Sequence, residues 1–303
     1  MRAKAKYIIV TPDYDDTSGG RIALHKLCHE LNQLGATAVI WPDKWVQRKK
    51  AYSLLKQFRL NVKDAVRGVP FYRHPDLNTP LAKLWGVGAR DIVVYPEVVA
   101  GNPLGSHNVV RWLLHRPGFH TGTVDYNDGD LFFKFADFAD DPTVTGGEAE
   151  RLFVFSINEA YRNQGLLKRQ GVCYLVRKGG DIEIGSSLAG ATKIDGLSHP
   201  EVAAIFNRCE TFYSFDDASM YSCYAAICGC TSVVLPKHYA SRQDWVAKNP
   251  ALQFGVAYGE DDMAHARATQ ELVFGHLKAL ENESIESVKR FIEITEERFG
   301  GRL

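Results

Sequence analysis

The first forty residues constrain the fold of this chain more than any other segment. Residues 7–11 form a short, β-branched apolar run, which is typical of a strand buried on both faces of a parallel sheet. After a polar turn over residues 12–20, apolar side chains recur at helical spacing over residues 22–34, and Gly35 follows where a helix would end. Residues 38–41 are expected to form the next strand. A helix that connects two such strands predicts a parallel sheet covered by helices.

The same pattern continues along the chain and begins again in its second half. We therefore predict an α/β protein with two Rossmann-like domains that face each other across a cleft. The N-terminal domain is placed at residues 1–165, the C-terminal domain at 166–275 and a last helical segment at 276–303, with the boundary in the polar stretch 158–171. Further strands are expected at residues 92–95, 109–114, 131–135, 152–156, 173–176, 192–194, 211–215, 232–235 and 254–257. Helices are expected at 45–60, 80–85, from 198 onward behind a capping box of Ser198 and Glu201, at 218–228 and at 271–299.

Charge and composition limit the classes of partner. The 303 residues include 36 basic and 36 acidic side chains, so the net charge is zero with histidine neutral. Binding to nucleic acid needs a basic footprint, and we therefore expect none. No apolar stretch reaches the ~20 residues that span a bilayer, and residues 7–10 are too short for a signal-peptide core, so a cytoplasmic protein is expected. The six cysteines suit reduced, buried positions rather than disulfides or a zinc site.

Two glycine pairs follow expected strands, at the edge where doubly wound sheets bind their ligands. Gly19 and Gly20 open the first helix. Free backbone amides there suit an anion or a polar sugar, although a simple helix cap has the same composition. Arg177 and Lys178 precede the second pair of glycines and suit a diphosphate, with arginine supplying a bidentate fork. An exposed basic turn is the alternative.

A third loop, at residues 215–220, joins an expected strand to an expected helix. The amides of the helix start and the hydroxyl of Ser219 would hold phosphate oxygens, while Asp216 or Asp217 could equally serve only as a helix cap. Two acidic triplets, at residues 13–15 and 128–130, have the composition of divalent-cation ligands. Because such triplets are ordinary in turns, we expect no metal site.

Two segments of the second half resemble a known family. Residues 194–217, which read IDGLSHPEVAAIFNRCETFYSFDD, and residues 225–234, which read AAICGCTSVV, resemble the nucleotide-sugar domain of GT-B glycosyltransferases of the family-4-like group. Gly19 and Gly20, followed by Leu24, His25 and Leu27, resemble the first strand–helix unit of that family. The resemblance is most specific over residues 170–235.

The resemblance implies a glycosyltransferase that moves a sugar from a nucleoside-diphosphate sugar to a saccharide or lipid-linked acceptor, in bacterial surface polysaccharide synthesis. It implies no metal or other cofactor, and a C-terminal helix that crosses back to the first domain. Retaining members of the family carry two glutamates eight positions apart, and the matching positions here hold Asp216 and Tyr224. The donor-binding residues that it implies are Gly19, Gly20, Arg177, Lys178, Gly196, Ser198, His199, Asp216, Asp217, Ser219, Met220 and Tyr224.

An inverting transfer would also need a base that takes the proton of the acceptor hydroxyl. We expect this base in the first domain, among Asp15, Asp16 and His115. Residues 115–118 form an acceptor-facing loop in this interpretation, because a cation and a rigid turn follow an expected strand. The acceptor-binding residues are expected to be Arg116, Asp125 and Tyr126.

Other classes of protein stay open at this point. A nucleotide-sugar epimerase or hydrolase of the same fold would turn over the donor without an acceptor. A non-catalytic protein that binds sugar nucleotides fits the tyrosine at position 224. A metal-dependent GT-A transferase would require one acidic triplet to bind manganese. A lipid-linked acceptor would bring peripheral contact with the inner face of a membrane, and the oligomeric state is left open.

Overall fold

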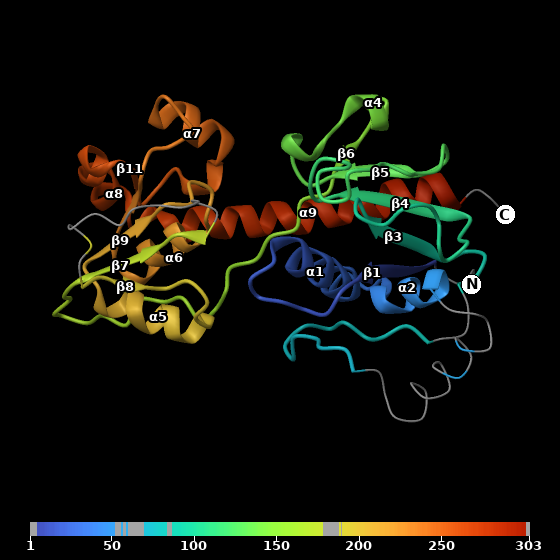
Figure 1. Ribbon diagram of the computed structural model, residues 1–303, viewed down its shortest axis with the longest axis horizontal. Coiled ribbons are helices and arrows are strands. Elements are labelled where there is room, and N and C mark those ends of the chain that lie inside the picture. The colour runs from blue at the N-terminus through green and yellow to red at the C-terminus, as the bar shows by residue number, and fades with distance from the viewer. Residues whose placement is uncertain are drawn as a thin grey trace. The chain divides into compact units, whose positions relative to one another are not determined.

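The chain divides into two units, each built on one parallel β-sheet (Figure 1). The computed structural model describes residues 5–51, 56, 59, 70–83, 87–177, 188 and 190–300. Unit 1 comprises Met1–Phe155 and Asn282–Leu303, and unit 2 comprises Ser156–Glu281. The predicted α/β class, with two Rossmann-like sheets, is confirmed. The last helix, α9 (Leu272–Gly300), begins in unit 2 and ends in unit 1.

Unit 1 contains a six-stranded sheet in which every neighbouring pair is parallel, in the order β2-β1-β3-β4-β5-β6. The strand order reverses at β1, because β2 pairs with one side of it and β3 with the other. The strands are β1 (Lys6–Thr11), β2 (Thr37–Pro42), β3 (Ile92–Pro96), β4 (Asn108–Leu113), β5 (Leu131–Lys134) and β6 (Glu150–Arg151). The helices are α1 (Gly19–Gln33), α2 (Asp43–Ala51), the short α4 (Pro142–Thr145) and the C-terminal part of α9.

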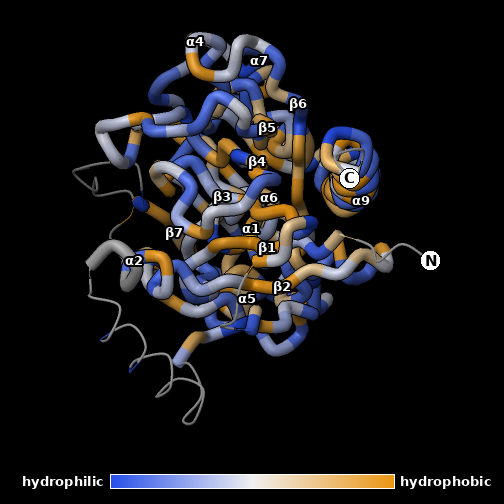
Figure 2. Tube along the Cα trace, turned by 90° about the vertical axis from the view of Figure 1, so that its right-hand side faces the viewer, coloured by the Kyte–Doolittle hydropathy of each residue, from blue (hydrophilic) through white to orange (hydrophobic). Residues whose placement is uncertain are grey.

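Both faces of this sheet are buried, which explains the continuous apolar runs of its strands. Successive side chains of a strand point to opposite faces. Tyr7 and Ile9 accordingly join the core that includes α1 and α9, whereas Ile8 and Val10 join a second core with Trp45 of α2. Figure 2 shows β1 and β2 as hydrophobic segments.

The C-terminal half of α9 completes the core of unit 1 (Figure 1). The ring of Phe291 is fully buried, with its centroid 5.6 Å from that of Tyr7 and 4.9 Å from that of Phe133. The hydroxyls of Tyr7 and Thr295 are hydrogen-bonded at 2.8 Å, so a polar pair inside this core also joins β1 to α9.

The strand predicted at residues 152–156 is found instead at Glu150–Arg151, as β6, and hydroxyl groups of α9 explain why it does not continue. Instead of residues 152–156, only β6 at Glu150–Arg151 pairs with the sheet. The amide of Phe153 donates to Ser287 Oγ at 2.8 Å, and the amide of Phe155 donates to Ser284 Oγ at 2.9 Å. Backbone groups that could extend the strand are therefore satisfied by a helix.

The region after β2 differs from its prediction in two ways. The helix expected at residues 45–60 is found as α2, and only positions 56 and 59 are described between residue 51 and residue 70. The helix expected at residues 80–85 is wrong for the described positions 80–83. There, Leu81 forms a parallel bridge with Ile40, and the amide of Ala82 donates to the Ile40 carbonyl at 2.7 Å.

Unit 2 contains a five-stranded sheet in the order β11-β10-β9-β7-β8, again with every neighbouring pair parallel. The strand order reverses at β7, which pairs with β8 on one side and with β9 on the other. The strands are β7 (Val172–Leu175), β8 (Thr192–Lys193), β9 (Thr211–Ser214), β10 (Thr231–Val234) and β11 (Val256–Tyr258). The helices are α5 (His199–Arg208), α6 (Tyr221–Cys228), α7 (Arg242–Lys248), α8 (Met263–Thr269) and the beginning of α9.

The core of unit 2 lies between its sheet and the helices α5 and α6. Phe206 of α5 packs against Phe212 of β9, with ring centroids 4.9 Å apart. All six cysteines of the chain are buried and free of disulfides, as the sequence predicts. Within the described ranges, no helix has both the length and the apolar character needed to cross a membrane.

We expect Phe291→Ala to lower the free energy of unfolding of unit 1 by about 3–5 kcal/mol, because it leaves a cavity between α9 and two strands. Hydrogen exchange of the β1 and β3 amides would measure this loss. Phe274→Ala is the matched control on the same helix, because Phe274 is 56% exposed and its loss is expected to change stability by less than about 0.5 kcal/mol. Equal effects of the two substitutions would contradict the packing described for α9.

Candidate functional site

The point where the strand order of unit 2 reverses gathers the predicted donor-binding loops. In open parallel sheets, ligands bind at the carboxyl edge at this reversal. The two strands at the reversal are β7 and β9. The amide of Phe215, just after β9, donates to the carbonyl of Leu175 at the end of β7, at 2.9 Å. The loops that follow these two strands therefore start side by side.

Arg177, two residues after β7, has an unusual backbone conformation. Its φ of 37° is the one positive value found at a non-glycine position in the described part of the chain. The carboxylate of Asp195 holds this turn, because it accepts hydrogen bonds from the amides of Val176 at 3.0 Å and Arg177 at 2.7 Å. Such left-handed positions are strained and cluster at functional sites. Lys178, the second predicted cation, lies outside the described residues.

The loop after β9 delays the start of the next helix. The predicted helix start at residue 218 is corrected to Tyr221, the first residue of α6. Two side chains of the loop accept hydrogen bonds from backbone amides. Asp216 Oδ1 accepts from the Ala218 amide at 3.2 Å, and Ser219 Oγ accepts from the Tyr221 amide at 3.3 Å. Both Asp216 and Ser219 are buried.

Tyr221 joins the loops after β7 and β9 into one site. The guanidinium carbon of Arg177 lies 5.8 Å from the centroid of the Tyr221 ring, and the Tyr221 amide is bonded to Ser219. The imidazole of His199 stacks on the same ring at 5.7 Å. The structure therefore brings together Arg177, Ser219 and His199, which lie up to 42 positions apart in the sequence.

The loop before α5 has the local structure that its sequence predicts. Gly196 has a φ of 80°, which favours glycine. The Glu201 carboxylate accepts hydrogen bonds from the Ser198 amide at 2.9 Å and from the Ser198 hydroxyl at 2.6 Å, which confirms the capping box. His199 is the first residue of α5, with its Nδ1 2.5 Å from the Tyr161 hydroxyl.

Tyr224 is buried in the core of unit 2, and Met220 is partly buried against it. The Tyr224 ring is buried and stacks on Tyr161 at 4.2 Å, with an angle of 4° between the rings. Burial raises the pKa of the Tyr224 hydroxyl, so this side chain stays neutral where the resembling family carries a carboxylate. Met220 packs against the same hydrophobic core.

Sequence reasoning missed a histidine at this edge. His238 follows β10, and its Nδ1 lies 2.8 Å from Asp217 Oδ2. The Asp217 carbonyl accepts a hydrogen bond from the indole of Trp245 at 2.6 Å, which fixes the aspartate. An imidazole oriented by a carboxylate can take or give a proton at its other nitrogen. The position of His238 just after an expected strand is the signal that could have found it.

A polar groove lies at the opposite, amino edge of the same sheet. None of the predicted site residues lines it, and Arg169 there donates to the carbonyls of Phe206 and Cys228 rather than to an open face. A substitution in this groove can therefore serve as a control for a substitution at the carboxyl edge. It is lined by residues 167–170, Glu210, Thr211, Gly229, Thr231 and Arg267.

The loop after β1 in unit 1 contains the predicted bases Asp15 and Asp16. Asp15 Oδ1 accepts hydrogen bonds from the Thr17 hydroxyl at 2.7 Å and the Thr17 amide at 2.9 Å. These bonds, led by that of the hydroxyl, lower the pKa of Asp15, which makes it a weaker base. Asp16 is exposed. Gly19 and Gly20 begin α1, as predicted.

Glu97 follows β3 directly, at the reversal of the unit 1 sheet, and sequence reasoning missed it. It is buried, and its Oε2 accepts a hydrogen bond from the Leu114 amide at 3.1 Å. Leu114 also approaches Gly20, whose Cβ, if present, would lie 3.6 Å from Leu114 Cδ1. Burial raises the pKa of the Glu97 carboxyl, against the opposing effect of backbone hydrogen bonds. A carboxyl group with a raised pKa is better suited to general acid–base chemistry than Asp15.

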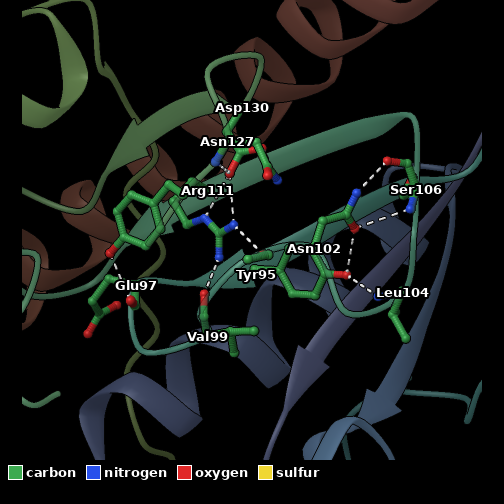
Figure 3. Close-up of polar contacts among 11 residues, drawn as sticks. Tyr95, Glu97, Val99, Asn102, Leu104, Ser106, Arg111, Asn127 and Asp130 are labelled. Atoms are coloured by element: carbon green, nitrogen blue, oxygen red, sulfur yellow. Dashed lines mark hydrogen bonds and ion pairs between the residues drawn. The ribbon is translucent and has the colours of Figure 1, made fainter. Parts of the chain in front are cut away.

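A buried ion pair supports the Glu97 loop (Figure 3). The Arg111 guanidinium is fully buried and bonds to Asp130 at 2.8 Å and to the carbonyls of Val99 at 2.5 Å and Gly101 at 2.9 Å. Every one of these acceptors lies on the loops after β3 or before β5. The ion pair therefore fixes the backbone that follows Glu97.

Two tyrosine rings enclose the same guanidinium. The Arg111 guanidinium carbon lies 5.0 Å from the Tyr95 ring centroid and 4.5 Å from that of Tyr126. Burial raises the pKa of each phenol to about 12. The Tyr126 hydroxyl donates to the Glu97 carbonyl at 2.8 Å. The hydroxyl of this predicted acceptor-binding residue is therefore hydrogen-bonded within the protein.

The other predicted residues of unit 1 lie around the ends of β4 and β5. The His115 ring contacts three aromatic rings: Phe119 at 4.0 Å, His120 at 5.1 Å and Phe138 at 5.8 Å. Arg116 is exposed and reaches Asp141 at 3.4 Å. Asp125 is exposed, and its carbonyl accepts a hydrogen bond from Gly101 at 2.7 Å.

The acidic triplets have other partners than a metal ion. Asp130 pairs with Arg111, and Asp15 is bonded to Thr17 and lies 3.4 Å from Arg21. Considering the described side chains alone, no group of three histidine, cysteine, aspartate or glutamate residues is placed to hold a metal ion.

No family model matches the chain, and no curated protein matches it. Among solved structures, the chain is similar to the crystal structure of MurG from Acinetobacter baumannii, with 11% sequence identity and a TM-score of 0.34, over 97% of this chain and 100% of that chain. At that TM-score the similarity supports no particular activity, and the assignment to the α/β class rests on the two parallel sheets.

We expect Asp130→Asn to lower the free energy of unfolding by about 3–5 kcal/mol, because it leaves the buried Arg111 charge without its partner. Urea unfolding followed by tryptophan fluorescence would measure the loss. Asp128→Asn, in the same triplet but at an exposed position, is the control and is expected to change stability by less than about 0.5 kcal/mol. A mild effect of Asp130→Asn would show that the ion pair does not support the loop.

Glu97→Gln should make the protein more stable at alkaline pH. Because the pKa of Glu97 is raised in the native state, folding favours the protonated form, and wild-type stability falls as pH rises from the ordinary carboxyl range through the raised value. Glutamine never ionises, so the melting temperature of the variant should exceed that of wild type by a few degrees at pH 8 and match it at pH 4. A difference that is the same at both pH values would be inconsistent with a buried, charge-disfavouring site.

Proposed function

We propose that the protein is a glycosyltransferase, with a nucleoside-diphosphate sugar bound at the carboxyl edge of unit 2 and a saccharide or lipid-linked acceptor at that of unit 1. The observation that carries the proposal is the group at the strand reversal of unit 2. There, Arg177 and the Ser219 loop meet at Tyr221, beside the first residue of α5. A cation, a hydroxyl and the starts of two helices form a set suited to a diphosphate.

The chemistry of transfer explains why such a set is useful. When the bond between the sugar and the diphosphate breaks, negative charge accumulates on the leaving oxygen. Arg177 would pair with it, and the Ser219 hydroxyl would donate to it, in a site where electrostatic stabilisation is usually the largest contribution. The strained, fixed backbone at Arg177 would hold this cation in place before the substrate arrives.

Unit 1 favours an enzyme over a protein that only binds. A buried carboxyl group with a raised pKa at the strand reversal is costly, and such groups cluster at catalytic sites. The proposal includes the features that the sequence resemblance implies: transfer without a metal or other cofactor, and a role in bacterial surface polysaccharide synthesis. It also includes peripheral contact with the inner face of a membrane, where a lipid-linked acceptor would lie.

A thermal-shift screen tests the proposal. The protein would be mixed with UDP-glucose, UDP-N-acetylglucosamine, GDP-mannose and dTDP-glucose, and at least one should raise the melting temperature, because a ligand of the native state stabilises it. Arg177→Ala should weaken binding of that sugar nucleotide at least about tenfold, which is ~1.4 kcal/mol. Arg267→Ala, in the groove at the opposite edge of the same sheet, is the control and should bind as wild type does.

Two results would count against the proposal. The first is no stabilisation by any sugar nucleotide. The second is a loss of affinity in Arg267→Ala with none in Arg177→Ala, which would move the site to the amino edge. Turnover of the donor without any acceptor would instead indicate the epimerase or hydrolase class.

A further inference from the structure

Unit 1 carries exposed aromatic rings where its predicted acceptor loop follows β4. Phe119 is 66% exposed and Phe138 is 60% exposed, although both contact the ring of His115. His120 packs at right angles to Phe119, with centroids 4.9 Å apart. The rings thus form one cluster, which we call the aromatic patch: His115, Phe119, His120 and Phe138.

Glu97 lies directly beside this patch. Its carboxylate accepts a hydrogen bond from the Leu114 amide, and the adjacent His115 amide and the charge of His120 also stabilise its ionised form. Figure 3 shows the Glu97 side chain turned away from the Arg111 guanidinium, so the buried ion pair does not neutralise it. The titratable groups that act on it are the His120 imidazole and the Tyr126 phenol.

We propose that the aromatic patch and Glu97 form the acceptor site, in which a pyranose ring lies against Phe119 and one of its hydroxyls bonds to the Glu97 carboxylate. A pyranose has an apolar face of C–H groups and a rim of hydroxyls. It therefore matches an aromatic surface with one hydrogen-bond acceptor beside it. This inference deepens the proposed function, but the binding of the saccharide does not depend on it.

Charge argues against a membrane as the occupant of the patch. Asp137, Asp140 and Asp141 flank Phe138, and Lys134 and Arg116 are the cations that pair with them. Anionic lipid surfaces attract clusters of excess basic residues, and this segment has an acidic excess. A neutral saccharide meets no such repulsion.

The binding claim is tested by NMR with methyl β-glycosides of glucose, galactose and N-acetylglucosamine. The imidazole signals of His115 and His120 should shift on addition of at least one glycoside. Phe119→Ala should raise the dissociation constant about five- to tenfold, as expected for loss of a contact worth about 1 kcal/mol. Phe274→Ala removes a ring of comparable exposure, 56%, from another surface and should bind as wild type does. If no glycoside shifts either imidazole, or if Phe119→Ala binds normally, the inference is wrong.

Glycoside binding together with no sugar-nucleotide binding would uphold the saccharide site and reject the glycosyltransferase proposal, so the two failures are distinguishable.

Discussion

Parallel pairing of strands is the constraint on which the rest of this protein depends. Because every strand of a sheet runs in the same direction, all the carboxyl ends lie at one edge, and the reversal of strand order leaves an opening there. In unit 2, this brings Arg177 next to the loop of Ser219. In unit 1, it places Glu97 beside Leu114, which in turn approaches Gly20 at the start of α1. Residues far apart in sequence become neighbours as a consequence of sheet topology alone.

Burial of polar groups shapes unit 1 in two opposite ways. The Arg111–Asp130 pair is tolerated because the guanidinium finds a carboxylate, two carbonyls and two aromatic faces. Burial raises the pKa of Glu97, against the opposing effects of backbone amides and of His120. The Arg111–Asp130 pair fixes the backbone of the loop, and Glu97 lies buried at the start of that loop. The burial of Glu97 is costly for stability, but the raised pKa of its carboxyl suits proton transfer. Such a division between supporting and reactive groups is common where stability is exchanged for function.

Most of the fold could be predicted from the sequence, because apolar periodicity is a local property. The strand at residues 109–114, the capping box at Ser198 and the long last helix all follow from spacing and capping chemistry. The errors arise where side-chain contacts, rather than local periodicity, determine where a strand or helix begins or ends. The strand expected at residues 152–156 is found at Glu150–Arg151, because serines of α9 bond the backbone beyond it. Helix α6 begins late because side chains of the preceding loop accept its first amide hydrogens. Glu97 and His238 were missed because their importance lies in partners that only the fold brings near.

The most direct test of the account is a map of where a nucleoside diphosphate binds. Backbone amide shifts would be followed by NMR during titration with UDP, GDP and dTDP. The account predicts that the largest changes for the diphosphate that binds lie at the carboxyl edge of unit 2, at Arg177, residues 195–199 and residues 216–221. Changes centred on the amino-edge groove, at residues 168–170 and Arg267, or spread without a centre, would contradict it.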